Sequence, residues 1–336
     1  MNQTFPLARY CFDFTVQTPL RLPDYAGSTL RGAFGNALRR ITCMTREKDC
    51  KPCALYRTCP YPQIFETPPP ENHSLQKFSQ VPNPYVIEPP PWGERTYQPG
   101  ETLSFHFVLA GRALDQFPFI VLAWQRAFLH GIGKGDGTAV LACIALIGQA
   151  GEDTVFVAEE GAIRAHEAAI LLSSKHLEEG KIRLTFHTPL RLQHNGAPLG
   201  PDKLVPRDLL MALVRRTALM AEFHTAQPLA LDFAQLAQQA ESIESEMRLH
   251  WRDWTRYSSR QQQKMALGGV VGEWVLYGDL GPFLPFLHLG QWLHVGKNAT
   301  FGLGKYNVNV GSAALDPTYM LSGVGRIKRS GSDDQK

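Results

Sequence analysis

The stretch FTVQTPLRL, residues 14–22, decides the fold because its last five residues, TPLRL, recur at the end of LTFHTPLRL, residues 184–192. Each copy closes a run of alternating polar and apolar residues, which is typical of a β-strand, and its proline suits a strand end. Each copy is followed by a short loop and then by a helical pattern that ends in paired arginines, over residues 28–40 and 207–216. This repetition of a strand and then a helix predicts that the chain consists of two similar units.

The rest of each half fits the same unit. Strand patterns begin at Tyr85, Glu101 and Thr138 and a helix pattern at Pro118 in the first half, and strand patterns begin at Leu267 and Phe301 and a helix pattern at Pro282 in the second. The segment 243–257 is ambiguous. Both halves therefore read βαββαβ. We predict an α+β fold of two tandem ferredoxin-like domains, with the helices on one face of each antiparallel sheet and the other face free for a ligand.

The length of 336 residues is sufficient for two domains with separate cores. The predicted parts are a first domain at 1–150, with a Cys-rich insertion at 43–59 and a Pro-rich, polyproline-like loop at 66–100, a linker at 151–180, a second domain with a Gly-rich loop at 181–312, and a tail at 313–336.

The composition, with 44% apolar and 19% charged residues, excludes bulk disorder. The net charge of +3 neither requires nor excludes a polyanionic partner. The longest apolar run, residues 117–124, is too short to span a bilayer, and the N-terminus lacks the basic segment and apolar core of a secretory signal. We therefore expect a cytoplasmic protein with reduced cysteines and no membrane partner.

Four cysteines lie within 17 residues, at Cys43, Cys50, Cys53 and Cys59. Thiolates this close together can surround a tetrahedral ion, and in a reducing compartment a metal is favoured over a disulfide. We expect a structural zinc ion, with an iron–sulfur cluster or free or disulfide-bonded thiols as alternatives. Because four cysteines leave no open coordination position, we expect no catalytic metal.

A glycine-rich segment near the C-terminus, residues 289–306, combines Gly296, Gly302 and Gly304 with Lys297 and Lys305. Glycines let backbone N–H groups approach a phosphate closely, and lysines supply positive charge. The segment lacks the glycine order of a Walker or dinucleotide motif. It therefore predicts a phosphate-binding loop of another kind, with a glycine-rich hairpin that binds no ligand as the alternative.

Cations also recur every fourth residue, at Arg248, Arg252, Arg256, Arg260 and Lys264, and are interleaved with Trp251, Trp254 and Tyr257. This spacing places the cations on one side of a strand or nearly on one stripe of a helix. Arginines beside aromatic rings suit single-stranded nucleic acid, whose phosphates pair with arginine and whose bases stack on the rings. The alternative is a solvated amphipathic face.

With these motifs placed, the chain resembles the CRISPR-associated endoribonucleases that process precursor repeat RNA, members of the repeat-associated mysterious protein superfamily. The matching segments are LPDYAGSTLRGAFGNALRR at 22–40, the cysteine cluster with CPYPQIFE, PYVIEPP at 84–90, YQPGETLSF at 97–105, RYSSRQ at 256–261, LGGVVGEW at 267–274 and HVGKNATFGLGKY at 294–306.

The resemblance implies two tandem ferredoxin-like domains and a basic cleft across both that holds CRISPR repeat RNA. It further implies metal-independent cleavage of one phosphodiester by the 2′-hydroxyl, which leaves a 2′,3′-cyclic phosphate and a 5′-hydroxyl. Other subunits of a CRISPR effector complex are expected as partners for the product. The alternative function is a non-catalytic guide-RNA-binding or scaffold subunit of such a complex.

The resemblance also indicates the site residues. Asn36 stands where many members carry a histidine, and asparagine cannot exchange protons near neutral pH. We expect Tyr25 and His224 to replace that histidine, in preference to His106 and His130. Asn36 is expected to orient the attacking hydroxyl or to donate a hydrogen bond to a phosphate oxygen. The cations expected to bind RNA are Arg31, Arg39, Arg40, Arg252, Arg256, Arg260, Lys297 and Lys305, with Gly296, Gly302 and Gly304 near the phosphates. Arg39 and Arg40 have the alternative role of complementing a helix C-terminus.

Overall fold

The computed structural model describes residues 4–69, 81–148, 151–171, 180–258, 263–310 and 313–314. Within these residues, none of the helices combines the length and the apolar character needed to span a bilayer.

The first domain is built on a five-stranded antiparallel sheet with the order β4-β6-β2-β7-β8. Its strands are β2 (Leu7–Val16), β4 (Tyr85–Glu88), β6 (Thr102–Ala110), β7 (Ala139–Gly148) and β8 (Gly151–Val157), and its helices are α1 (Gly27–Thr42), α2 (Pro60–Phe65) and α3 (Phe117–His130). Alternate residues of the central strand β2, such as Phe12 and Phe14, pack with Leu30, Phe34 and Trp124 of α1 and α3 in one core. The two long helices therefore cover one face of the sheet.

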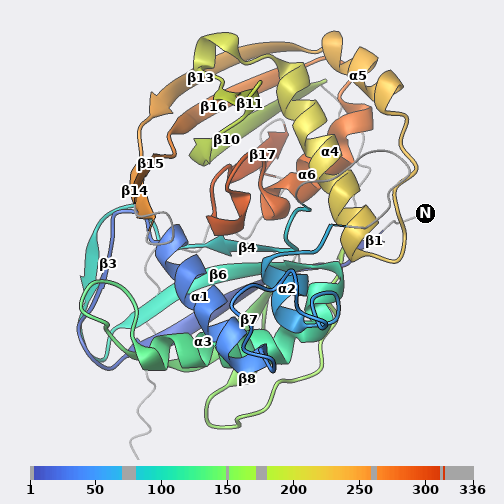
Figure 1. Cartoon of the computed structure of the whole chain (residues 1–336). Helices are drawn as coiled ribbons and strands as arrows, with labels where there is room; N and C mark the ends of the chain where they lie inside the picture. Colours follow the sequence, from blue (N-terminus) through green and yellow to red (C-terminus); the bar gives the residue numbers. More distant parts are fainter. Residues whose placement is uncertain are drawn as a thin grey trace, which may run out of the picture.

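The second domain repeats this arrangement with the order β13-β16-β10-β17-β18 (Figure 1). Its strands are β10 (Lys181–Leu190), β13 (Glu244–Arg252), β16 (Gly269–Tyr277), β17 (Tyr306–Val310) and β18 (Ala313–Ala314), and its helices are α4 (Pro206–His224), α5 (Phe233–Glu241) and α6 (Leu284–Leu293). Both halves follow the split βαβ order, so the predicted pair of tandem ferredoxin-like domains is confirmed.

The remaining elements are short. They are the strand pairs β1 (Thr4–Phe5) with β9 (Ile170–Leu171), β3 (Leu20–Leu22) with β5 (Arg95–Tyr97), β11 (Gln193–His194) with β12 (Ala197–Pro198) and β14 (Thr255–Ser258) with β15 (Gln263–Ala266), and the 3₁₀ turns η1 (Gly111–Gln116), η2 (Pro201–Lys203), η3 (Gly281–Phe283) and η4 (Ala299–Phe301).

Three segments differ from the sequence-based expectation. The predicted linker at 151–180 begins with β8, which pairs with β7 and completes the first sheet. The predicted polyproline-like loop at 66–100 contains β5 as well as β4, because residues 95–97 pair with the repeated motif at 20–22. The ambiguous segment 243–257 is mostly extended: β13 lies at one edge of the second sheet and pairs with β16 along its whole length.

The two domains pack closely against each other, and this corrects the expected free face of the first sheet. Leu7, Val86 and Val108 lie on the sheet face opposite α1 and α3 and are buried against Leu289 and Trp292 of α6. Strands whose successive side chains are all apolar are typical of a sheet that is covered on both faces, and most of β4 and the end of β6 have this pattern. Part of the second face is thus occupied by the other domain.

Candidate nucleic-acid interface

The glycine-rich segment lies at the junction of the domains, and its glycines contact protein backbone. A Cβ atom at Gly302 would lie 2.5 Å from Tyr25 Oη and 2.7 Å from the Ile87 carbonyl oxygen, and at Gly304 it would lie 1.8 Å from the Val295 carbonyl oxygen. Gly296 is similarly close to Arg191, and all three glycines have positive φ. The glycines therefore serve close packing and turns.

A buried carboxylate joins this segment to the first domain. Glu88, at the end of β4, accepts hydrogen bonds from Arg9 Nη2 at 2.9 Å, Lys305 Nζ at 2.9 Å and His294 Nε2 at 3.1 Å. Arg9 also donates to the Gln291 carbonyl oxygen at 2.9 Å. Glu88, Arg9 and His294 are almost completely buried. These contacts tie β2 and β4 to α6 and to the glycine-rich segment.

The charged neighbours of Glu88 determine whether its carboxyl group is ionised. Burial by itself would raise the pKa of Glu88, but the charges of Arg9 and Lys305 and the bond from His294 outweigh burial and hold the pKa well below its usual value. Burial lowers the pKa of His294, and the hydrogen bond and the charge of Glu88 oppose this effect. Lys305, predicted to bind RNA, is therefore engaged by Glu88 and has only 17% of its side chain exposed.

Tyr25 lies inside the junction and does not suit the predicted catalytic role. Its hydroxyl donates to the Phe301 carbonyl oxygen at 2.9 Å, and its ring stacks on Trp92 with centroids 4.3 Å apart. Burial, with a smaller effect of Glu88, raises the pKa of Tyr25 well above its usual value. The guanidinium of Arg252 lies over the Trp92 ring, 3.9 Å from its centroid. The Tyr25 hydroxyl is thus buried and engaged by the backbone of the second domain.

His224 is buried at another part of the domain junction. Its Nε2 donates to the Pro82 carbonyl oxygen at 2.7 Å, and burial lowers its pKa to about 4. A ring that is inaccessible and neutral is poorly placed for proton exchange with RNA. Burial also lowers the pKa of His106 to about 4. The predicted trio is therefore not assembled: Tyr25 and His224 are buried apart, whereas Asn36 is exposed.

Asn36 instead faces a cation-rich trough on the surface of the first domain. Asn36 and Arg40 of α1 line two adjoining hollows of about 640 and 500 Å³, the size range of ordinary ligand sites. Arg126 and His130 of α3 line one hollow, and Arg39, Arg46 and Lys48 line the other together with one carboxylate, that of Glu47. We call this surface the α1–α3 trough. Its charge suits a polyanion.

The other cations predicted to bind RNA have varied positions. Lys297 is exposed, whereas Arg31 lies 4.2 Å from the Phe65 ring centroid and is half-buried. The backbone of Arg256 lies in β14, and Arg260 falls outside the described residues.

Arg39 has a second function at the cysteine-rich loop. Its guanidinium donates to the carbonyl oxygens of Glu47 and Lys48, at 2.5 and 2.7 Å, which holds the loop against α1. It therefore has fewer free donors for a phosphate than Arg40, which is exposed.

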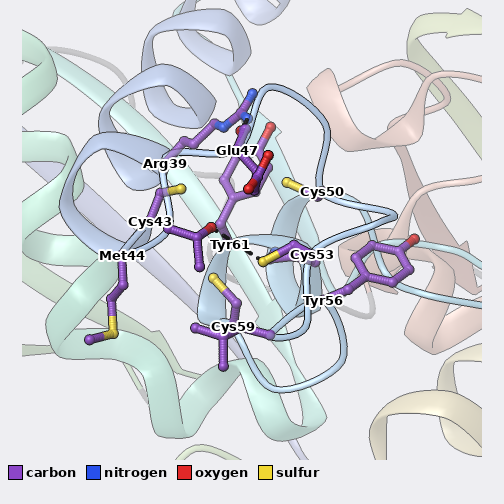
Figure 2. Close-up of a pocket in the computed structure, with 12 residues that line it drawn as sticks. Arg39, Cys43, Met44, Glu47, Cys50, Cys53, Tyr56, Cys59 and Tyr61 are labelled. Atoms are coloured by element: carbon purple, nitrogen blue, oxygen red, sulfur yellow. Dashed lines mark hydrogen bonds between the residues drawn. The ribbon is translucent and has the colours of Figure 1, made fainter.

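The cysteine-rich loop, residues 43–59, connects α1 and α2 without forming a helix or strand. Cys43, Cys50, Cys53 and Cys59 are all free thiols and all line one cavity of about 20 Å³ (Figure 2). A cavity of this volume holds roughly one water-sized particle. Thr45 Oγ1 lies 3.3 Å from Cys53 Sγ. The four thiols therefore line the same cavity, and whether they hold an ion stays a prediction.

Sequence reasoning missed Glu88 and Arg9, and it set His130 aside. Charged residues inside the apolar strands YVIE and LARYCFDF were the available signal for the buried cluster, since such groups are rarely buried without a partner. The signal for the trough was the spacing of Arg126 and His130, four residues apart on one face of a helix.

Known proteins share this organisation. A family model described as an N-terminal domain matches residues 5–168, and the model of CRISPR-associated endoribonuclease Cas6 matches residues 184–306. No curated protein is significantly similar to the chain.

Solved structures match nearly the whole chain. A Cas6 (TTHB231) product complex has 18% identity and a TM-score of 0.53, with 89% of this chain and 98% of that chain covered. Thermus thermophilus Cas6 (TTHB231) has 16% identity and a TM-score of 0.50, with 91% and 99% covered. A partial Cas6-RT-Cas1–Cas2 complex has 15% identity and a TM-score of 0.53, with 93% of this chain and 48% of that chain covered.

At such low identity these structures establish the fold, while the family model establishes the relationship of the second half. Residues 184–306 thus match the family of CRISPR-associated endoribonuclease Cas6, and the two domains of the chain have the fold of solved Cas6 proteins.

Proposed function

We propose that the protein binds CRISPR repeat RNA and cleaves one phosphodiester without a metal, through attack by the 2′-hydroxyl. The products are a 2′,3′-cyclic phosphate and a 5′-hydroxyl. The observation that carries this proposal is the match of residues 184–306 to an endoribonuclease family. The exposed cations of the α1–α3 trough support it, because phosphate contacts supply most of the affinity for nucleic acid.

The second candidate is a non-catalytic subunit that binds guide RNA and delivers it to other CRISPR effector subunits. Asn36 favours this candidate, since the exposed amide cannot act as an acid or base. The two substitutes that the sequence predicted, Tyr25 and His224, are both buried, and this also favours the second candidate.

One assay separates the two functions. The purified chain is incubated with its own repeat RNA in excess EDTA, and the products are resolved by size and by end chemistry. Cleavage at a single site with a cyclic phosphate end supports the first candidate. Tight binding of RNA that stays intact supports the second, and a lack of affinity even at low salt contradicts both.

We also propose that Cys43, Cys50, Cys53 and Cys59 hold a structural zinc ion. Four thiolates complete a tetrahedral zinc site, and a metal would stabilise a 17-residue loop that has no regular structure. In the part of the chain that the structure describes, no three His, Cys, Asp or Glu side chains are arranged to hold an ion. Binding therefore requires the thiols to move closer together.

Elemental analysis of the purified protein tests this proposal. We expect about one zinc ion per chain, its loss in Cys53→Ser, and its retention in the control Cys143→Ser, which lies on β7 outside the loop. A chain free of metal that takes up no zinc contradicts the proposal. Iron with sulfide would indicate a cluster in place of zinc.

A further inference from the structure

We propose that His130 is the general base of the cleavage reaction, in an RNA site formed by the α1–α3 trough. This inference rests on the proposed endoribonuclease function and goes beyond it by naming the site and the residue. Among the histidines that the structure describes, only His130 lines the trough. It is exposed and lies in the last turn of α3.

The hydrogen bond of His130 determines which ring nitrogen accepts a proton. Its Nδ1 lies 2.8 Å from the carbonyl oxygen of Arg126, four residues earlier in the same helix. A carbonyl oxygen can only accept, so Nδ1 carries the hydrogen in the neutral ring. Nε2 is then left with its lone pair. The local helix geometry therefore prepares a proton acceptor on the surface of a cationic hollow.

The neighbouring groups complete a site for phosphodiester cleavage. Arg40 and Arg126 line the same hollow as His130, one from each helix, and both are exposed. Two guanidinium groups at one phosphate would stabilise the negative charge that grows on its oxygens in the transition state. Asn36, in the same hollow, supplies an amide that orients the attacking hydroxyl. Acid–base, charge-stabilising and positioning groups thus lie together in one hollow.

Each bond change at phosphorus is accompanied by a proton transfer. Nε2 of His130 takes the proton of the 2′-hydroxyl while O2′ forms a bond to phosphorus. The bond from phosphorus to O5′ breaks, its electron pair stays on O5′, and O5′ takes a proton from water. The hydroxide that remains is neutralised by the proton held on the imidazolium. The products are a 2′,3′-cyclic phosphate and a 5′-hydroxyl, and no metal is used.

His130→Ala tests the proposal, with His194→Ala as a matched control, because His194 is also exposed but lies in β11 of the second domain. Single-turnover cleavage is measured in EDTA with the protein in saturating excess over its repeat RNA, and affinity is measured on RNA that lacks the attacking 2′-hydroxyl. We expect His130→Ala to slow cleavage by about 10²–10⁴-fold while affinity stays close to wild type. Added imidazole should partly restore the rate, and His194→Ala should behave as wild type.

Other outcomes overturn the inference in distinguishable ways. If the wild type cleaves and His130→Ala is equally fast, His130 is not the base and the proposed function stands. If His130→Ala weakens binding but retains the rate at saturation, His130 is a binding residue. If the wild type binds RNA and never cleaves it, the endoribonuclease proposal and this inference both fail.

Discussion

The Glu88 side chain connects three parts of the domain junction, because it bonds to β2, to the residue after α6 and to the residue before β17. Its carboxylate pairs with Arg9 and Lys305 and accepts from His294, so it connects both domains in a region without solvent. Buried ion clusters contribute less to net stability than to the choice of one arrangement, but removal of one member leaves the other charges uncompensated. The junction therefore depends on this carboxylate remaining charged.

We expect Glu88→Gln to lower the free energy of unfolding by about 3–5 kcal/mol, because Arg9 and Lys305 both lose the negative charge of the carboxylate that they contact. Urea denaturation followed by tryptophan fluorescence measures the change. Glu241→Gln is the control, since its pair with Arg207 is exposed. An effect of Glu88→Gln no larger than that of the control would show that the cluster does not hold the domains together.

The half-buried His106 and the buried His224 make stability depend on pH. The folded chain takes up their protons near pH 4, whereas an unfolded histidine takes up its proton near 6.5. A pKa that is lower in the folded state gives stability that is complete above about pH 6.5 and is lost as the pH falls toward 4. Each histidine accounts for up to about 3 kcal/mol of that loss.

His224→Gln should reduce this pH dependence, because an amide keeps a donor for the Pro82 carbonyl oxygen and does not titrate. Urea midpoints at pH 7 and pH 4.5 measure the effect. Cleavage by the variant near neutral pH should match the wild type. A large loss of cleavage with unchanged affinity would instead restore His224 as a catalytic residue.

The segment from His294 to Tyr306 packs closely against the first domain. It crosses from α6 to β17 with Gly302 at φ +95° against Tyr25 and Ile87. The same segment contacts the start of α1, where a Cβ at Gly27 would lie 2.1 Å from the Phe301 carbonyl oxygen. The second domain therefore packs directly against the helix that carries Asn36 and Arg40.

Gly302→Ala should destabilise the protein by about 2 kcal/mol or more, because the methyl group meets two atoms of the other domain and the backbone angle is strained. Gly32→Ala is a matched control inside α1, where nothing lies within 4 Å of the added Cβ. The control should stabilise the protein by up to about 1 kcal/mol. Thermal unfolding compares both variants with the wild type, and equal behaviour of the two would contradict the packing described.

Across the whole molecule, exposed cations lie on both domains. Arg40 and Arg126 belong to the first domain, and Lys297 belongs to the second. The glycine-rich segment joins these surfaces through its contact with α1. We therefore expect one RNA strand to contact both domains.

Binding of repeat RNA over a range of salt concentrations tests this expectation. Arg40→Ala and Lys297→Ala should each weaken binding and lower the slope of affinity against salt by about 0.7–1, because each removes one phosphate contact. The double variant should show the sum of both changes. If Lys297→Ala leaves the slope unchanged, the RNA is confined to the first domain.

The predicted helices and strands were mostly confirmed where the pattern of nearby residues determines the secondary structure. The helices at 28–40 and 207–216 are present as parts of α1 and α4, because amphipathic periodicity and a strand-ending proline act within a few residues. The strand β8 in the predicted linker was missed, because its place depends on pairing with β7 rather than on its own sequence.

The candidate site was predicted less well than the fold. Tyr25 and His224 carry suitable chemical groups, but their accessibility depends on how the two domains pack, and both are buried. His130 and Arg126 come close to Asn36 only through the packing of α3 beside α1. Residue type alone contains no information on such contacts.

The sequence by itself determined the duplicated βαββαβ order, the gathering of four cysteines and the family of the second half, because repeats, spacing and motifs are local properties of the chain. Only the tertiary structure decided which charges are exposed for RNA and which are buried as partners. Burial and pairing arise between residues far apart in sequence, as Glu88 and Lys305 demonstrate across 217 positions.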